Sequence, residues 1–150
     1  MTAKTEVIGT ELGSVTFPVE RGKIAEFARA VLADDHAAYF DPDRDGGIIA
    51  PPTFTQTIAF WERPEPDAPI PDFGLDFTRV VHGEQEFEYL APIHAGDTLT
   101  ATSRISDVYE RETSKGVMSF VAFENRYVNQ DGETVAISRM ILLEPPLPGA

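Results

Sequence analysis

The chain has 150 residues, of which 42% are hydrophobic and 25% charged, and it contains no cysteine. This length suits one domain with one core, and the absence of thiols excludes disulfides, thiolate metal sites and a cysteine nucleophile. The formal net charge of −13 predicts an acidic surface that repels phosphate backbones. We therefore expect no nucleic-acid partner.

The chain is expected to be cytoplasmic and to form one domain over residues 1–150. No apolar run approaches the roughly 18 residues of a membrane span, and the N-terminus lacks a secretion signal, so we expect no membrane partner. The polar start and proline-rich end predict an ordered core over 7–143 with frayed ends. Because His36, His82 and His94 lack metal-ligand spacing, we expect neither a metal nor another cofactor.

The first part of the chain predicts a strand followed by a helix. Residues alternate along Ser14–Val19 as in a short strand, and Pro18 favours the edge of a sheet. Arg21–Ala33 carries apolar residues at the spacing of one helical face, and a loop is predicted over 39–47. The residues of that helical face are Ile24, Phe27, Ala28 and Val31.

A second, shorter helix is predicted over Thr53–Trp61, with Thr53 or the residue before it as its cap. Most of this segment is apolar, so the helix should be buried. Four prolines within Pro64–Pro71 then predict an extended loop, of the kind that often forms a lid. The large apolar residues of the helix are Phe54, Ile58 and Trp61.

The second half predicts four strands of an antiparallel meander, and its clearest turn signal is Asn129–Gly132. Three of these strands have roughly ten or more residues, whereas about five or six is usual. Long strands with one buried helix indicate an α+β fold, in which the sheet wraps around that helix. The predicted strands are Glu84–Leu90, Thr98–Tyr109, Val117–Asn129 and Glu133–Leu143.

Several segments resemble the N-terminal type of MaoC-like dehydratases, namely Phe27–Asp35, Ile48–Phe54 and His82–Tyr89, with Pro92 and Gly96–Leu99 after them. That family includes the subunits of the mycobacterial (3R)-hydroxyacyl-ACP dehydratase and the first domain of eukaryotic hydratase 2. The resemblance implies the hot-dog fold, a long antiparallel sheet wrapped around a buried helix. It also implies that two hot-dogs pair into a continuous sheet and bind an acyl-CoA or acyl-ACP thioester between them.

In active members of the family, an Asp-x-Asn-Pro-x-His stretch activates a water that adds across a 2-enoyl thioester. Here Asp34 occupies the Asp position, His36 the Asn position, and Tyr39 (Phe40 if the register shifts by one) the catalytic His position. Tyrosine, whose ordinary pKa is about 10, is a poor base at neutral pH. Asp34 and His36 could form a variant acid–base pair, but we favour a simpler interpretation, in which Asp34 helps to end a helix and His36 is a polar loop residue.

The resemblance implies a second loss at the start of the buried helix. Active members hold the thioester carbonyl there with a backbone N–H from an Ala-His-Gly-like turn. The corresponding turn here is Ala50–Thr53, and Pro52 has no N–H to donate. The two losses together match the non-catalytic partner type of the family.

The leading hypothesis is a subunit of a heteromeric (R)-specific enoyl-thioester hydratase or 3-hydroxyacyl dehydratase, active only with a catalytic hot-dog partner. The alternatives are a self-sufficient hydratase that uses Asp34 and His36, for example as a homodimer, and a non-enzymatic thioester-binding hot-dog. The candidate substrate-binding residues are Tyr39, Thr53, Phe54 and Trp61. Of these, Phe54 and Trp61 are expected first of all to be core residues.

Overall fold

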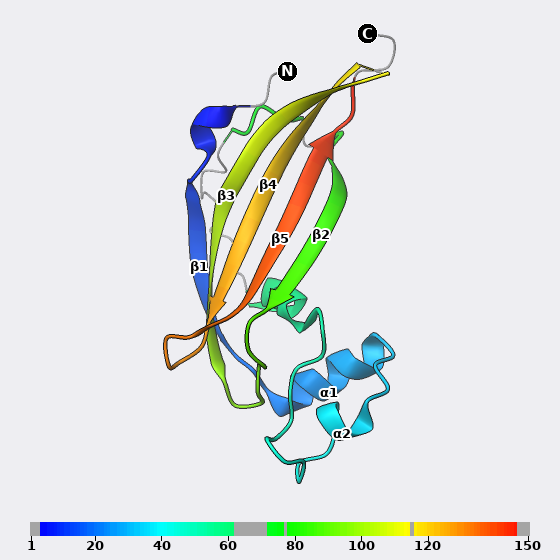
Figure 1. Ribbon diagram of the computed structural model, residues 1–150, viewed down its shortest axis with the longest axis vertical. Helices are drawn as coiled ribbons and strands as arrows, with labels where there is room; N and C mark the ends of the chain where they lie inside the picture. The colour runs from blue at the N-terminus through cyan, green and yellow to red at the C-terminus, as the bar shows by residue number, and fades with distance from the viewer. Residues whose placement is uncertain (1–3, 62–71, 77, 115, 147–150) are drawn as a thin grey trace.

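The computed structural model describes residues 4–61, 72–76, 78–114 and 116–146. It contains five strands, with short helices before and between them (Figure 1). The strands are β1 (Glu11–Pro18), β2 (Val81–Tyr89), β3 (Thr98–Thr113), β4 (Gly116–Val128) and β5 (Thr134–Glu144). The helices are η1 (Thr5–Val7), α1 (Arg21–Ala30), α2 (His36–Tyr39) and η2 (Phe54–Phe60).

The five strands form one antiparallel sheet in the order β1-β3-β4-β5-β2, so β1 and β2 are its edges. The predicted edge position of the first strand is therefore confirmed, and Pro18 closes that strand opposite Thr98. The predicted hairpin turn is also confirmed, because the Asn129 N–H donates to the Glu133 carbonyl at 2.9 Å. Within the described residues, no helix is long and apolar enough to cross a membrane.

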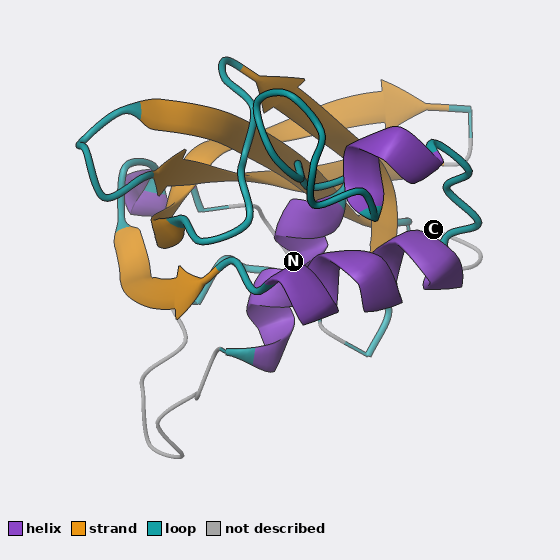
Figure 2. Cartoon of the chain, turned by 90° about the horizontal axis from the view of Figure 1, so that it is seen from below, coloured by secondary structure: helices purple, strands orange, loops and turns teal. Residues whose placement is uncertain are grey.

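Helix η1 lies toward one end of the strands, whereas α1, α2 and η2 lie on one side of the sheet at the other end (Figures 1 and 2). The first core cluster lies at this end, where Ile24 of α1 and Phe54 of η2 pack on sheet residues such as Leu99. The second core cluster lies further along the strands, where Phe73 and Leu75 pack on β3 and β4. This arrangement confirms the predicted α+β architecture of a long sheet with a helix against one face.

The predicted helix over Thr53–Trp61 is present as η2, a 3₁₀ helix of 7 residues. At a rise of about 2 Å per residue, η2 is about 14 Å long. The 13-residue strand β4 is about 43 Å long at about 3.3 Å per residue. The helix therefore covers only part of the inner face. Phe73 and Leu75 cover another part, and Pro64–Pro71, predicted as a lid, lies outside the described residues.

The chain between the two helical regions differs from the prediction. Helix α1 ends at Ala30, three residues early, because Leu32 adopts a positive φ of 55° that breaks the helical path. The chain then forms α2, where a loop had been expected to begin. The Asp35 carboxylate caps α2 by accepting the Ala38 N–H at 3.1 Å. This cap positions Tyr39, the last residue of α2.

Strand β5 extends one residue past Leu143, where the sequence predicted the end of the last strand. Glu144 belongs to β5 and is only 6% exposed. Its carboxylate binds the Arg79 guanidinium at 2.7 Å and the Asp76 N–H at 3.0 Å. These contacts fasten Asp76 and Arg79 to the end of the sheet.

The outer face of the sheet carries a charged network around Glu124, which is 8% exposed. Arg104 binds its carboxylate at 2.7 Å and Arg139 binds it at 3.3 Å, while Arg139 also contacts Glu86 and Glu88 of β2. Burial of the Glu124 carboxylate acts to raise its pKa, but the hydrogen bonds and charges of the two arginines outweigh burial. The pKa of Glu124 therefore lies below its ordinary value.

Candidate functional site

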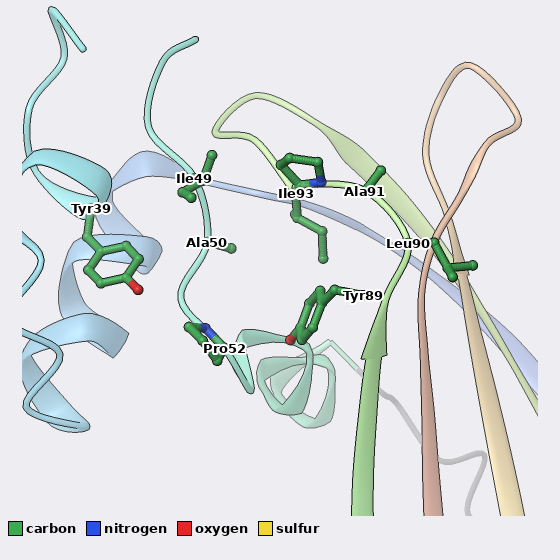
Figure 3. Close-up of a pocket in the computed structure, with 9 residues that line it drawn as sticks. Tyr39, Ile49, Ala50, Pro52, Tyr89, Leu90, Ala91 and Ile93 are labelled. Atoms are coloured by element: carbon green, nitrogen blue, oxygen red, sulfur yellow. The ribbon is translucent and has the colours of Figure 1, made fainter. Parts of the chain in front are cut away.

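An open groove of about 440 Å³ lies between α2, the segment that leads into η2, and the end of β2 (Figure 3). Its walls are mostly aliphatic. The tyrosines Tyr39 and Tyr89 bring the polar side-chain atoms into it from opposite sides. The lining residues are Tyr39, Ile49, Ala50, Pro52, Tyr89, Leu90, Ala91, Pro92 and Ile93.

Backbone hydrogen bonds fix the two walls of this groove. Ile49 forms an isolated β-bridge with His94, and the Ala50 N–H donates to the Ile93 carbonyl at 2.8 Å. The Ile49 N–H donates to the Ala38 carbonyl of α2 at 3.0 Å. Three segments that are distant in sequence therefore meet at this groove, and its shape is set by main-chain contacts.

The groove ends at the first turn of η2, where Thr53 has an unusual backbone. Its φ is 71°, in the left-handed region, which costs a residue with a β-carbon about 1–2 kcal/mol. A hydrogen bond accompanies this conformation, because the Thr53 N–H donates to the Tyr89 hydroxyl at 3.0 Å. Thr53 occupies the N-cap position of η2, one of the two positions predicted for the cap, but its side chain makes no capping hydrogen bond. Thr53 acts here through its backbone.

The electrostatics of the groove favour an uncharged polar group. None of the lining residues is Asp, Glu, His, Lys or Arg. Burial of its ring raises the pKa of Tyr89, and hydrogen bonds from Thr55 and Thr53 offset only part of this effect. Tyr89 is therefore a neutral phenol near pH 7, and its side chain can act as a hydrogen-bond donor but not as a base.

The predicted catalytic residues Asp34 and His36 lie outside the groove, and both are exposed. The His36 ring packs against the Phe40 ring with 5.2 Å between their centroids, and the Arg29 guanidinium lies over the Phe40 ring at 5.1 Å. Among the described residues, no three His, Asp or Glu side chains gather as metal ligands. The structure thus does not bring Asp34 and His36 to the groove.

The four candidate substrate-binding residues occupy different places. Tyr39 lines the groove, and Thr53 lies at its end. Phe54 is buried, and its ring packs edge-on against Phe27 at 5.7 Å. Trp61 is partly buried against the same core cluster. Tyr89 was missed as a site residue, because in the sequence it only alternates with Phe87 along a predicted strand.

Comparison with known proteins identifies the family. A family model described as "FAS1-like, dehydratase domain region" matches residues 6–138. The chain belongs to this family. Its fold and its structural neighbours are those of MaoC-like hot-dog dehydratases, so the resemblance seen in the sequence is confirmed.

Its relatives include proteins of actinobacteria. A UPF0336 protein of Streptomyces griseus is 45% identical over 97 residues, which is 61% of this chain and 63% of that protein. The match therefore spans less than two thirds of that relative. A UPF0336 protein of Leifsonia xyli is 38% identical over 130 residues, covering 83% of this chain and 84% of the relative.

The similar solved structures include two-chain complexes from Mycobacterium tuberculosis. One is the C-terminally truncated HadBC (3R)-hydroxyacyl-ACP dehydratase complex, with 30% identity, a TM-score of 0.67, and coverage of 93% of this chain and 98% of that chain. The other is the ChsH1–ChsH2 complex, with 18% identity, a TM-score of 0.69, and coverage of 93% and 86%. The second likeness supports the fold alone.

Proposed function

We propose that this chain is the non-catalytic, thioester-holding subunit of a two-chain (R)-specific 2-enoyl-thioester hydratase or 3-hydroxyacyl dehydratase. The observation that carries the proposal is the groove, which contains two tyrosines and no carboxylate or imidazole among its lining residues. Hydration needs a group that accepts a proton from water near neutral pH, and a phenol does not meet that need. The partner supplies the catalytic Asp and His.

The start of η2 supports the same division of roles. As water adds to the enoyl group, negative charge grows on the thioester carbonyl oxygen, and catalysis requires donors aimed at that oxygen. Pro52 lines the groove and has no N–H, and the Thr53 N–H is already bound to Tyr89. The start of η2 therefore offers no free backbone N–H from Pro52 or Thr53 to that oxygen.

The edge strand β2 is the proposed contact with the partner. An unpaired edge presents backbone donors and acceptors that a second sheet can bind. Three large apolar residues are exposed along or just after this strand, namely Val81 at 50%, Tyr89 at 38% and Leu90 at 55%. Because the groove lies at the end of β2, a hot-dog paired along this edge would cover it. The two-chain nature of the HadBC and ChsH1–ChsH2 neighbours supports such a heteromer.

The proposal predicts a heteromer that depends on Leu90. The purified chain is mixed with a hot-dog chain from the same organism that carries an intact Asp-x-Asn-Pro-x-His stretch. Complex formation is measured by native mass spectrometry and hydration by loss of enoyl-thioester absorbance. Leu90→Asp should weaken the complex at least about tenfold, because it places a charge in an apolar contact. The matched control is Leu12→Asp on the opposite edge strand β1, where Leu12 is 38% exposed and the complex should persist.

Other outcomes point to the alternatives. A stable homo-oligomer that hydrates the thioester without the partner contradicts the proposal and favours the self-sufficient enzyme. Loss of turnover in the Asp34→Ala/His36→Ala double variant would then confirm that alternative. A heteromer no more active than the partner alone indicates a non-enzymatic binding subunit. Equal weakening by the two leucine variants contradicts the choice of the β2 edge.

A further inference from the structure

We infer that the Tyr89 hydroxyl is the hydrogen-bond donor that holds the carbonyl oxygen of an acyl thioester in the groove, in place of the backbone N–H that Pro52 lacks. The inference rests on the proposed function, because it assumes that a thioester binds here. It adds a specific binding residue and the atom of the ligand that this residue recognises.

The geometry at the end of the groove places this hydroxyl in position. Tyr89 is the last residue of β2, and its side chain points across the groove toward Pro52 and the start of η2 (Figure 3). Its oxygen accepts the Thr53 N–H at 3.0 Å. Thr55 also acts on this hydroxyl as a hydrogen-bond donor. A hydroxyl has two lone pairs and one hydrogen, so it can accept bonds from Thr53 and Thr55 and still donate its own hydrogen. The side chain is 38% exposed, and a ligand in the groove can therefore reach it.

The Thr53 N–H does more than fix the position of the phenol. A hydroxyl that accepts a hydrogen bond becomes a better donor, because hydrogen bonds in a chain polarise one another. The Thr53 N–H therefore does not reach the groove itself, but it strengthens the Tyr89 O–H as a donor there. This O–H takes the place of the backbone N–H that Pro52 lacks. The left-handed φ of 71° at Thr53 forms part of the turn that presents this N–H to Tyr89.

The remaining lining residues restrict the ligand class. The groove carries no charged side chain, and the whole chain has a net charge of −13. A phosphate would find no cation among these lining residues. An aliphatic chain with one uncharged carbonyl fits a groove of aliphatic residues with one fixed hydroxyl. The acyl end of a thioester has this chemistry, and its phosphate-bearing carrier does not.

The two tyrosines of the groove offer a matched test. Tyr89→Phe and Tyr39→Phe each remove one hydroxyl from the same groove, but only Tyr89 accepts the N–H of Thr53. The probe is S-hexanoyl-N-acetylcysteamine with ¹³C in its thioester carbonyl. It is saturated, so it cannot be hydrated, and it has no phosphate, so charge repulsion does not obscure binding. Binding is measured by calorimetry, and the carbonyl stretch of the bound probe by infrared difference spectroscopy.

In the wild-type chain, binding should shift the carbonyl stretch to lower frequency than in an aprotic solvent. Tyr89→Phe should abolish this shift and weaken binding about fivefold to tenfold, the loss expected for one hydrogen bond. Tyr39→Phe should retain the shift. A probe that binds with an unchanged shift in Tyr89→Phe overturns the assignment of Tyr89 and leaves the proposed function standing. A probe that does not bind to the wild-type chain overturns both.

Discussion

Replacing Phe54 with alanine is expected to lower the free energy of unfolding by about 3–5 kcal/mol, the cost typical of removing a buried phenylalanine. Phe54 is 1% exposed and belongs to the core cluster that joins α1 and η2 to the sheet. Its ring also makes an edge-on contact with Phe27, with 5.7 Å between centroids. Because η2 has only 7 residues, few other contacts can replace this anchor.

Urea denaturation followed by circular dichroism measures this loss. Domains of this size are commonly stable by only about 5–15 kcal/mol, so a loss of this size removes much of the stability and a milder variant is needed beside Phe54→Ala. Phe54→Leu keeps most of the buried volume and should cost less than half as much. The control is Phe40→Ala, which removes a partly exposed ring that packs at a tilt against His36 and is expected to cost about 1 kcal/mol. If Phe54→Ala and Phe40→Ala destabilise the protein equally, η2 is not anchored as described.

The second large effect is expected at Glu144, where replacement by alanine should lower the free energy of unfolding by about 2–3 kcal/mol. The substitution leaves the Arg79 guanidinium and the Asp76 N–H without the carboxylate that both bind. Removing one partner of a buried ion pair typically costs about 3–5 kcal/mol. We expect less here, because the Arg79 side chain remains 25% exposed and water can solvate it.

The matched control for Glu144 is a surface pair of similar geometry. Lys23 and Glu26 also form an ion pair, at 2.8 Å, but the Glu26 side chain is 70% exposed. Glu26→Ala should therefore cost about 0.5 kcal/mol or less. Urea midpoints measure both changes, and hydrogen exchange at the Asp76 N–H should accelerate only in Glu144→Ala. Equal costs for the two variants would show that Glu144 does not fasten Asp76 and Arg79 to the sheet.

The strands were predictable because their residues alternate, but β1, β2 and β3 were predicted too short, and β3 differs most. Strand β3 continues to Thr113, four residues beyond the predicted end at Tyr109. Its added residues are polar and exposed, so they give no hydrophobic signal. Aromatic and cation–π contacts stabilise this end of β3 instead. The Arg111 guanidinium lies over the rings of Tyr109 and Phe120 at 5.0 and 5.4 Å, and these two rings stack across β3 and β4.

The candidate site could be predicted only in part. The motif resemblance singled out Tyr39 and the turn at Pro52, and both line the groove. Tyr89 could not be singled out, because it lies 36 residues from Thr53 in the chain and meets it only through the fold. The positive φ of Thr53 could not be predicted either, because nothing in the adjacent sequence requires a left-handed residue at this position. Contacts of this kind depend on how β2 and the turn before η2 are placed in space.

The most direct test of the central claim is hydration of a short and a long trans-2-enoyl-CoA by the purified chain alone. Loss of the conjugated-thioester absorbance reports the reaction, and circular dichroism first establishes that the protein is folded. We predict no turnover above the rate without protein, because the groove lacks a base near neutral pH. Clear turnover by the folded chain, with no partner present, would contradict the assignment of a non-catalytic subunit.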